Sequence, residues 1–65
     1  MISKKDLKDY EIETIDDYYN MIVESQINGN FTQMRKQIKQ LNKNQYLDFM
    51  IYLQDNGIDI KKFVR

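Results

Sequence analysis

TIDDYYNMIVESQINGN, residues 14–30, contains in order a helix start, an apolar helical face and a helix stop. Thr14, with Asp17 three residues later, forms a variant of the capping box that begins many helices. Apolar side chains then recur at helical spacing on one side of the predicted helix, namely Ile15, Tyr18, Tyr19, Ile22, Val23 and Ile27. Gly29 is typical of a left-handed C-cap. This stretch therefore predicts a helix over about 15–28.

A second helix is predicted directly after this stop, over about 31–42. Its apolar residues form a narrow seam of the kind that contacts one or two neighbouring helices, namely Phe31, Met34, Ile38 and Leu41. Asn30 is expected to cap this helix, with Gln33 as its capping-box partner. Because the connection is so short, the first two helices are expected to form a helical hairpin.

A third helix is predicted over about 45–56, with Asn42 or Asn44 as its cap and Gly57 as its stop. Its apolar residues surround most of the circumference and leave Asp48 and Asp55 as the solvent face. Such a helix is expected to be the central element of a bundle or to contact another chain.

The two ends of the chain complete the predicted fold. Ser3 can cap a short helix that reaches Tyr10, so residues 1–13 are expected to form a short helix or a flexible arm. Asp59 can cap a short C-terminal helical turn that docks Phe63 or Val64. The sequence therefore predicts one all-α domain over residues 1–65, a small three-helix bundle with a C-terminal helical turn.

Composition excludes several classes of function. The chain has no Cys and no His, which removes disulfides, thiolate or imidazole metal sites and catalysis by either side chain. No phosphate-binding glycine loop or nucleophile motif is present either, so we expect no enzyme, no cofactor, no metal and no small-molecule substrate. The longest apolar run, Phe49–Leu53, is too short to span a bilayer, so we expect a cytoplasmic protein without a membrane partner.

Charge is balanced overall but segregated along the chain. Ten basic and ten acidic side chains cancel, yet seven acids fall within residues 1–24 and residues 25–47 carry only cations. Those cations lie on one side of the second predicted helix, as a stripe of Arg35, Lys36, Lys39 and Lys43. The stripe has several interpretations. It can be a surface for a partner protein, a helix face in solvent, or a set of cations paired with the acidic first helix. It can also be a surface that contacts the phosphates of nucleic acid.

Reading of DNA by this helix is the less favoured interpretation. Gln33 and Gln37 stand where they can approach bases, and Gly29 stands where a helix-turn-helix has its turn. However, polar Asn28 and Asn30 flank this glycine, and Arg35 occupies a position where the motif usually buries an aliphatic residue. Nucleic acid is therefore retained as an alternative partner.

Apolar surface in excess of what three helices need to cover each other favours self-association. We expect a homodimer with the third helix near the contact. The candidate self-association residues are Tyr46, Phe49, Met50, Tyr52 and Leu53.

The stretch DDYYNMIVESQINGNFTQMRKQIKQLNKNQYLDFMIYLQDNG, residues 16–57, is rich in Asn, Lys, Ile, Tyr, Phe and Met, and the chain has no Ala. In this it resembles the short helical accessory proteins of phages and integrative elements in low-GC Gram-positive bacteria. The resemblance implies a small protein that binds a host or element-encoded protein, or sometimes DNA.

The leading hypothesis is therefore a non-enzymatic interaction module that modulates another macromolecule. A small DNA-binding regulator is the first alternative. An inhibitor whose N-terminal acids mimic nucleic acid is the second, and it requires those acids to cluster on one exposed surface.

Overall fold

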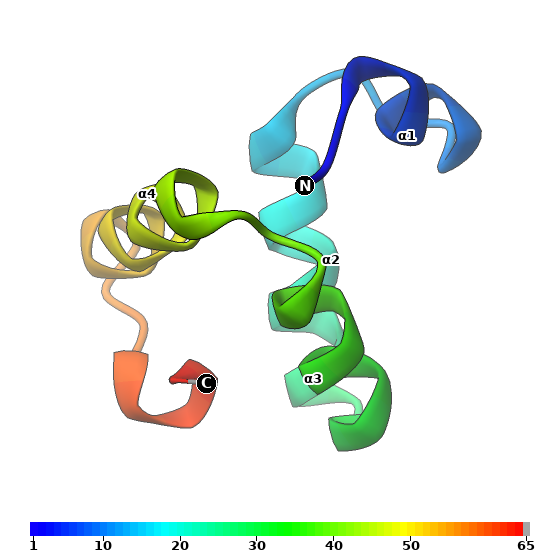
Figure 1. The fold of residues 1–65 in the computed structure, drawn as a ribbon. Coiled ribbons are helices and arrows are strands. Elements are labelled where there is room, and N and C mark those ends of the chain that lie inside the picture. The colour runs from blue at the N-terminus through cyan, green and yellow to red at the C-terminus, as the bar shows by residue number, and fades with distance from the viewer. Residues whose placement is uncertain (65) are drawn as a thin grey trace.

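The computed structural model describes residues 1–64, which form four α-helices and a final 3-10 turn (Figure 1). The elements are α1 Lys4–Asp9, α2 Ile15–Ile27, α3 Phe31–Lys39, α4 Lys43–Asp55 and η1 Ile60–Phe63. The all-α class is confirmed, and the three longer helices lie where they were predicted. The largest difference is that α3 ends at Lys39 instead of continuing to about 42, because Asn42 has an extended backbone and caps α4.

The central element is α2, so of the two alternatives for the third predicted helix the central position in the bundle does not hold. Figure 1 shows α2 running through the middle of the molecule, and it packs against both α3 and α4. Three of its side chains are almost completely buried, namely Tyr18, Tyr19 and Ile22. α4 packs against α2 and η1, and it leaves Leu47 and Ile51 exposed on its outward side.

Tyr18 and Tyr19, which are adjacent in α2, form hydrogen bonds to the two other long helices, α3 and α4. The hydroxyl of Tyr18 donates a hydrogen bond of 2.9 Å to the backbone carbonyl of Gln37 in α3. The hydroxyl of Tyr19 lies 2.8 Å from Oδ2 of Asp48 and 3.1 Å from the carbonyl of Gln45, both in α4. Each buried phenol thus has a partner for its polar end, as burial of such a group requires.

Aromatic rings continue this core towards the C-terminus. The ring of Phe49 lies 5.3 Å from that of Tyr19 and 5.6 Å from that of Phe63, the latter in an edge-on arrangement at 89°. Edge-on packing places the positive ring edge against a negative face. The expected docking of the C-terminal turn is therefore made by Phe63, whereas Val64 stays exposed.

Three helices begin with a reciprocal capping box. The pairs are Ser3 with Asp6, Thr14 with Asp17, and Asn42 with Gln45. Backbone hydrogen bonds from Ser3 and Thr14 respectively are the main cause that lowers the pKa of the Asp6 and Asp17 carboxyls. The short N-terminal helix is thus confirmed, and Asn42 is the cap that α4 uses.

The predicted capping box between Asn30 and Gln33 is wrong. Asn30 makes no side-chain capping bond and its backbone is not extended, with φ −85° and ψ 63°. The reason is that Asn30 also belongs to the end of α2, where its amide donates to the carbonyl of Ser25 at 2.8 Å. One residue cannot hold both the closing geometry of one helix and the extended geometry of a cap.

Three helices end with the same Schellman arrangement, in which two amides after the helix bind back to its last carbonyls. In each case one of the two bonds joins residues five apart in the sequence, namely Ile12 to Leu7, Asn30 to Ser25, and Ile58 to Leu53. The residue that must adopt positive φ is glycine in two cases, Gly29 and Gly57, but it is Glu11 at the end of α1. Both glycines were predicted as stops, and Glu11 was not.

Substitutions at Gly57 and Glu11 are expected to change stability in opposite directions. At Gly57 φ is +67° and no heavy atom lies within 4 Å of an added Cβ, so Gly57→Ala costs only backbone strain, about 1 kcal/mol. Glu11→Gly removes the same strain but adds flexibility to the unfolded chain, for a net gain of about 0.5 kcal/mol. Urea unfolding of the two variants measures both changes in the free energy of unfolding. Two changes of the same sign would contradict this account.

The N-terminal segment is attached to α4 by one side chain. Gln45 accepts a hydrogen bond from the amide of Ile2 at 3.0 Å and donates one to its carbonyl at 2.7 Å. These bonds hold Ile2 in the core, where its side chain is buried. The flexible-arm alternative for residues 1–13 is thus replaced by a docked segment.

Candidate functional site

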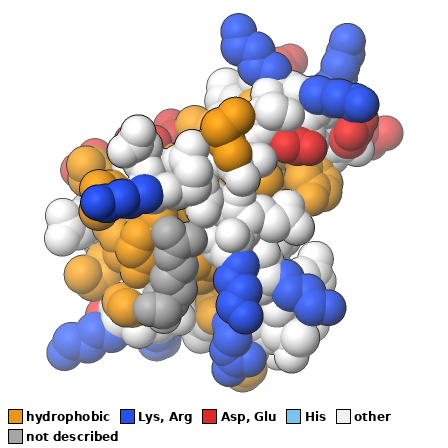
Figure 2. Space-filling view, in the orientation of Figure 1, with side chains coloured by type: hydrophobic (Ala, Val, Ile, Leu, Met, Phe, Trp, Pro, Cys, Tyr) orange, Lys and Arg blue, Asp and Glu red, His pale blue; other side chains and the backbone are white. Residues whose placement is uncertain are grey.

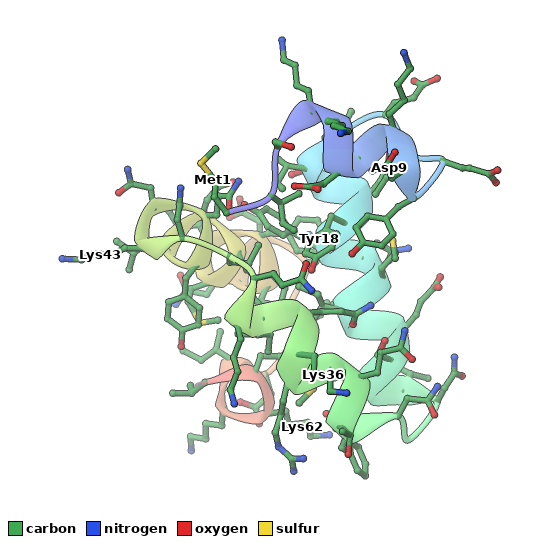
Figure 3. All side chains as sticks on the ribbon, turned by 45° about the vertical axis from the view of Figure 1, so that its right-hand side comes forward. Met1, Asp9, Tyr18, Lys36, Lys43 and Lys62 are labelled. Atoms are coloured by element: carbon green, nitrogen blue, oxygen red, sulfur yellow. The ribbon has the colours of Figure 1, made fainter. Side chains whose placement is uncertain are left out.

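The predicted four-cation stripe is divided in the structure. Arg35, Lys36 and Lys39 are exposed on α3, but Lys43 is the first residue of α4 because α3 ends earlier than predicted. Figure 3 shows Lys43 on the opposite side of the α3–α4 connection from Lys36. Cationic side chains nevertheless gather over α3 in Figure 2, with no acidic side chain among them.

Of the two glutamines predicted near bases, Gln33 is exposed and Gln37 is not. Gln37 is buried, and its Oε1 accepts a hydrogen bond of 2.9 Å from the hydroxyl of Ser25 in α2. This corrects the prediction, since a side chain held between two helices cannot reach a base. The physical reason is that Gln37 faces the same side of α3 as Met34 and Ile38, which are buried against the rest of the core.

The acidic first turn of α2 lies beside α4, and Asp17 is used within its own helix cap. Asp16 lines a shallow hollow together with Asp48 and Asp55, next to α4. Pairing of the cations on α3 with the acidic first turn of α2 is therefore not supported. Two surfaces of opposite sign result, one beside α4 and one on α3.

The predicted self-association residues divide between core and surface. Phe49 and Leu53 are completely buried inside the chain, which corrects their assignment to an interface. Tyr52 packs on Tyr19 with ring centres 5.5 Å apart. Tyr46 and Met50 are half-buried.

The outward side of α4 carries two apolar residues that sequence reasoning missed. Leu47 is 52% exposed and Ile51 is 55% exposed. At helical spacing they lie on one side with the half-buried Tyr46 and Met50. We call these four residues the α4 outer face. The sequence shows that apolar residues surround α4, but this pattern does not indicate which side of the helix is buried.

A groove runs between α3 and the C-terminal segment. It has a volume of about 460 Å³. Its lining consists of Gln26, Phe31, Met34, Arg35, Ile38, Lys39, Lys62 and Val64. Lys62, in η1, replaces Lys43 as the companion of the α3 cations, and sequence reasoning missed it because only folding brings η1 to α3. We call this site the α3 groove.

Lys36 and Gln33 belong to a different part of the α3 surface. They line a separate hollow with Gly29, Asn30, Phe31 and Thr32. Arg35 and Lys39 therefore face the α3 groove, whereas Lys36 lies outside it, although all three cations are on one short helix.

Another hollow lies at the N-terminal end of the molecule. It has a volume of about 760 Å³ and lies between α1 and the first turns of α2 and α4. Two of its polar side chains, Gln45 and Asp48, are already hydrogen-bonded within the protein. Across residues 1–64, every buried side-chain polar atom has a partner, and no cluster of acidic residues is arranged to hold a metal ion.

Comparison with protein-family models, with characterised proteins and with solved structures finds no match for this chain. Among the described residues, no helix has the length and apolar character needed to cross a membrane.

Proposed function

We propose that the chain is a non-enzymatic protein–protein interaction module that forms a homodimer through the α4 outer face. The observation that carries this proposal is the exposure of Leu47 and Ile51 side by side on a helix whose opposite side is the core. Apolar side chains placed together in solvent favour association, because contact removes their area from water.

The charges at the ends of α4 support a second copy as the occupant of this face. Lys43 is its first residue and Asp55 its last, and both are exposed. In a two-fold symmetric dimer with the α4 helices antiparallel, Lys43 of one copy lies near Asp55 of the other, and Leu47 lies near Ile51. The face is thus complementary to itself in charge and in apolar character.

Replacing Leu47 and Ile51 together by lysine is expected to convert the dimer into a monomer. Two like-charged residues from each copy then meet at the contact, and the apolar contribution is lost. Light scattering at a protein concentration of about 0.1 mM, followed by dilution, measures the change because dimer formation depends on concentration.

Ile27→Lys is the matched control for this experiment. Ile27 is 76% exposed on α2 and belongs to neither the α4 outer face nor the α3 groove. The same change from aliphatic to cation is expected to leave the dimer intact there. A monomeric wild-type chain, or equal loss of dimer in the control, would refute the proposed interface.

The proposed role is modulation of another protein in the cytoplasm by this dimer. The resemblance to phage and mobile-element accessory proteins supports the role, and the exposed surfaces of α3 and α4 offer separate places for a partner and a second copy. The DNA-binding alternative keeps the exposed cations but loses Gln37 as a base-contacting residue.

A further inference from the structure

The α3 groove combines an apolar floor with a rim of one charge. Met34 and Ile38 form buried parts of the lining, while Phe31 and Val64 are partly exposed at its edges. Arg35, Lys39 and Lys62 supply three cations, and no acidic residue is among the described lining residues. The acidic residues Asp16, Asp48 and Asp55 lie elsewhere, in a hollow beside α4.

This chemistry selects a particular kind of partner. An apolar floor contributes binding energy only if the partner also buries apolar side chains. A purely cationic rim attracts carboxylates and repels cations, so it determines which apolar segments can enter. A helix that carries aliphatic anchors along one side and acidic residues beside them meets both requirements.

We infer that the α3 groove is the docking site for an acidic amphipathic helix of a partner protein, with aliphatic side chains against Phe31, Met34 and Ile38 and carboxylates on Arg35, Lys39 and Lys62. This inference rests on the proposed function, because it names the partner chemistry of the same module. It assigns the partner to α3 and the second copy to α4.

The arrangement of the groove favours a peptide over duplex DNA as the ligand. Phosphate backbones are bound by cations and hydrogen-bond donors, so an apolar floor contributes nothing to such contacts. Here the cations that line the recess are separated from Lys36, which lies outside it on the same helix. A DNA backbone is expected to contact Lys36 as well as the cations of the groove, whereas a ligand inside the groove contacts only Arg35, Lys39 and Lys62.

The test is a binding titration of the whole chain with a synthetic acidic helix. The probe is a fluorescently labelled peptide with Leu at positions i, i+4 and i+7 and Glu at the flanking positions. Binding is expected by fluorescence anisotropy at an ionic strength of about 0.05 M, and it is expected to weaken when the ionic strength is raised to about 0.3 M. The same peptide with Lys in place of each Glu is expected not to bind.

Variants locate the site on the protein. Arg35→Gln, Lys39→Gln and Lys62→Gln combined are expected to weaken binding about tenfold, since each exposed ion pair contributes a factor of about two to three. Lys39→Gln alone is compared with Lys36→Gln, which removes the same charge from the same helix outside the groove. Only the first is expected to weaken binding. Phe31→Ala, which removes an apolar contact and no charge, is expected to weaken it as well.

Three outcomes would overturn the inference. The first is absence of peptide binding at low ionic strength. The second is binding of duplex DNA in preference to the peptide, with equal loss in Lys36→Gln and Lys39→Gln. The third is self-association that Lys39→Gln abolishes, which would make a second copy the occupant of the groove.

Failure of this inference is distinguishable from failure of the proposed dimer. The Leu47→Lys/Ile51→Lys variant leaves the α3 groove unchanged and is expected to bind the peptide as the wild type does. Binding by a chain that is monomeric throughout would refute the dimer alone. A dimer that binds no peptide would refute the groove assignment alone.

Discussion

Replacing Phe49 by alanine is expected to lower the free energy of unfolding by about 3–5 kcal/mol. Phe49 is completely buried and joins Tyr19 of α2 to Phe63 of η1, so its removal leaves a cavity between three elements. A domain of 65 residues has a total stability of only about 3–10 kcal/mol, so this loss removes a large part of it. Urea unfolding followed by far-ultraviolet circular dichroism measures the change.

Leu47→Ala is the control for Phe49→Ala because it lies on the same helix. Leu47 is 52% exposed within one copy, so at a concentration at which the chain is monomeric its truncation is expected to change stability by no more than about 0.5 kcal/mol. Phe49→Leu, which keeps most of the buried area, is expected to cost about 1 kcal/mol and remains measurable if the alanine variant does not fold. Equal stability of the Phe49→Ala and Leu47→Ala variants would contradict the assignment of Phe49 to the core.

Stability is expected to fall steeply above pH 10, because Tyr18 and Tyr19 are buried. Burial raises the pKa of both phenols above their ordinary value of 10.0, and for Tyr19 the hydrogen bond to Asp48 raises it further. The unfolded chain loses these protons at a lower pH than the folded chain does. The stabilisation from each phenol is therefore fully present below pH 10 and is lost as the pH rises towards the folded-state pKa.

Each buried tyrosine is expected to contribute a slope of about 1.4 kcal/mol per pH unit in this range, and the two together about 2.7. Denaturant unfolding at a series of pH values above neutrality measures the slope. Tyr18→Phe and Tyr19→Phe are each expected to remove about half of it, because phenylalanine keeps the ring without the titrating hydroxyl. An unchanged slope in both variants would mean that neither phenol titrates differently on folding.

Local signals in the sequence were sufficient for the helices and most of their ends. The capping box of Thr14 with Asp17 acts through contacts only three residues apart, and the structure confirms it. Of the two caps predicted for the third helix, Asn42 or Asn44, the structure uses Asn42. Asn30 failed as a cap because the end of α2 also requires that residue. Glu11 was missed because positive φ at a residue other than glycine has no compositional signal.

The candidate site was predicted less well, because its residues come from different elements. The exposed Arg35 and Lys39 could be read from helical spacing alone. Lys62 could not, since only the docking of η1 brings it to α3. Gln37 was misassigned because the sequence alone does not show whether a glutamine is exposed or is buried with a hydrogen-bond partner, as Gln37 is with Ser25.

The sequence by itself determined where this chain forms helices, how most of them begin and end, and that its charges are segregated, because these features depend on neighbours within a few residues. Only the tertiary structure decided that α2 is central, that Phe49 and Leu53 belong to the core, and that Leu47 and Ile51 face outwards. The physical reason is that an apolar residue gains equally from burial against any partner. Which side of α4 is buried therefore depends on how the whole chain packs.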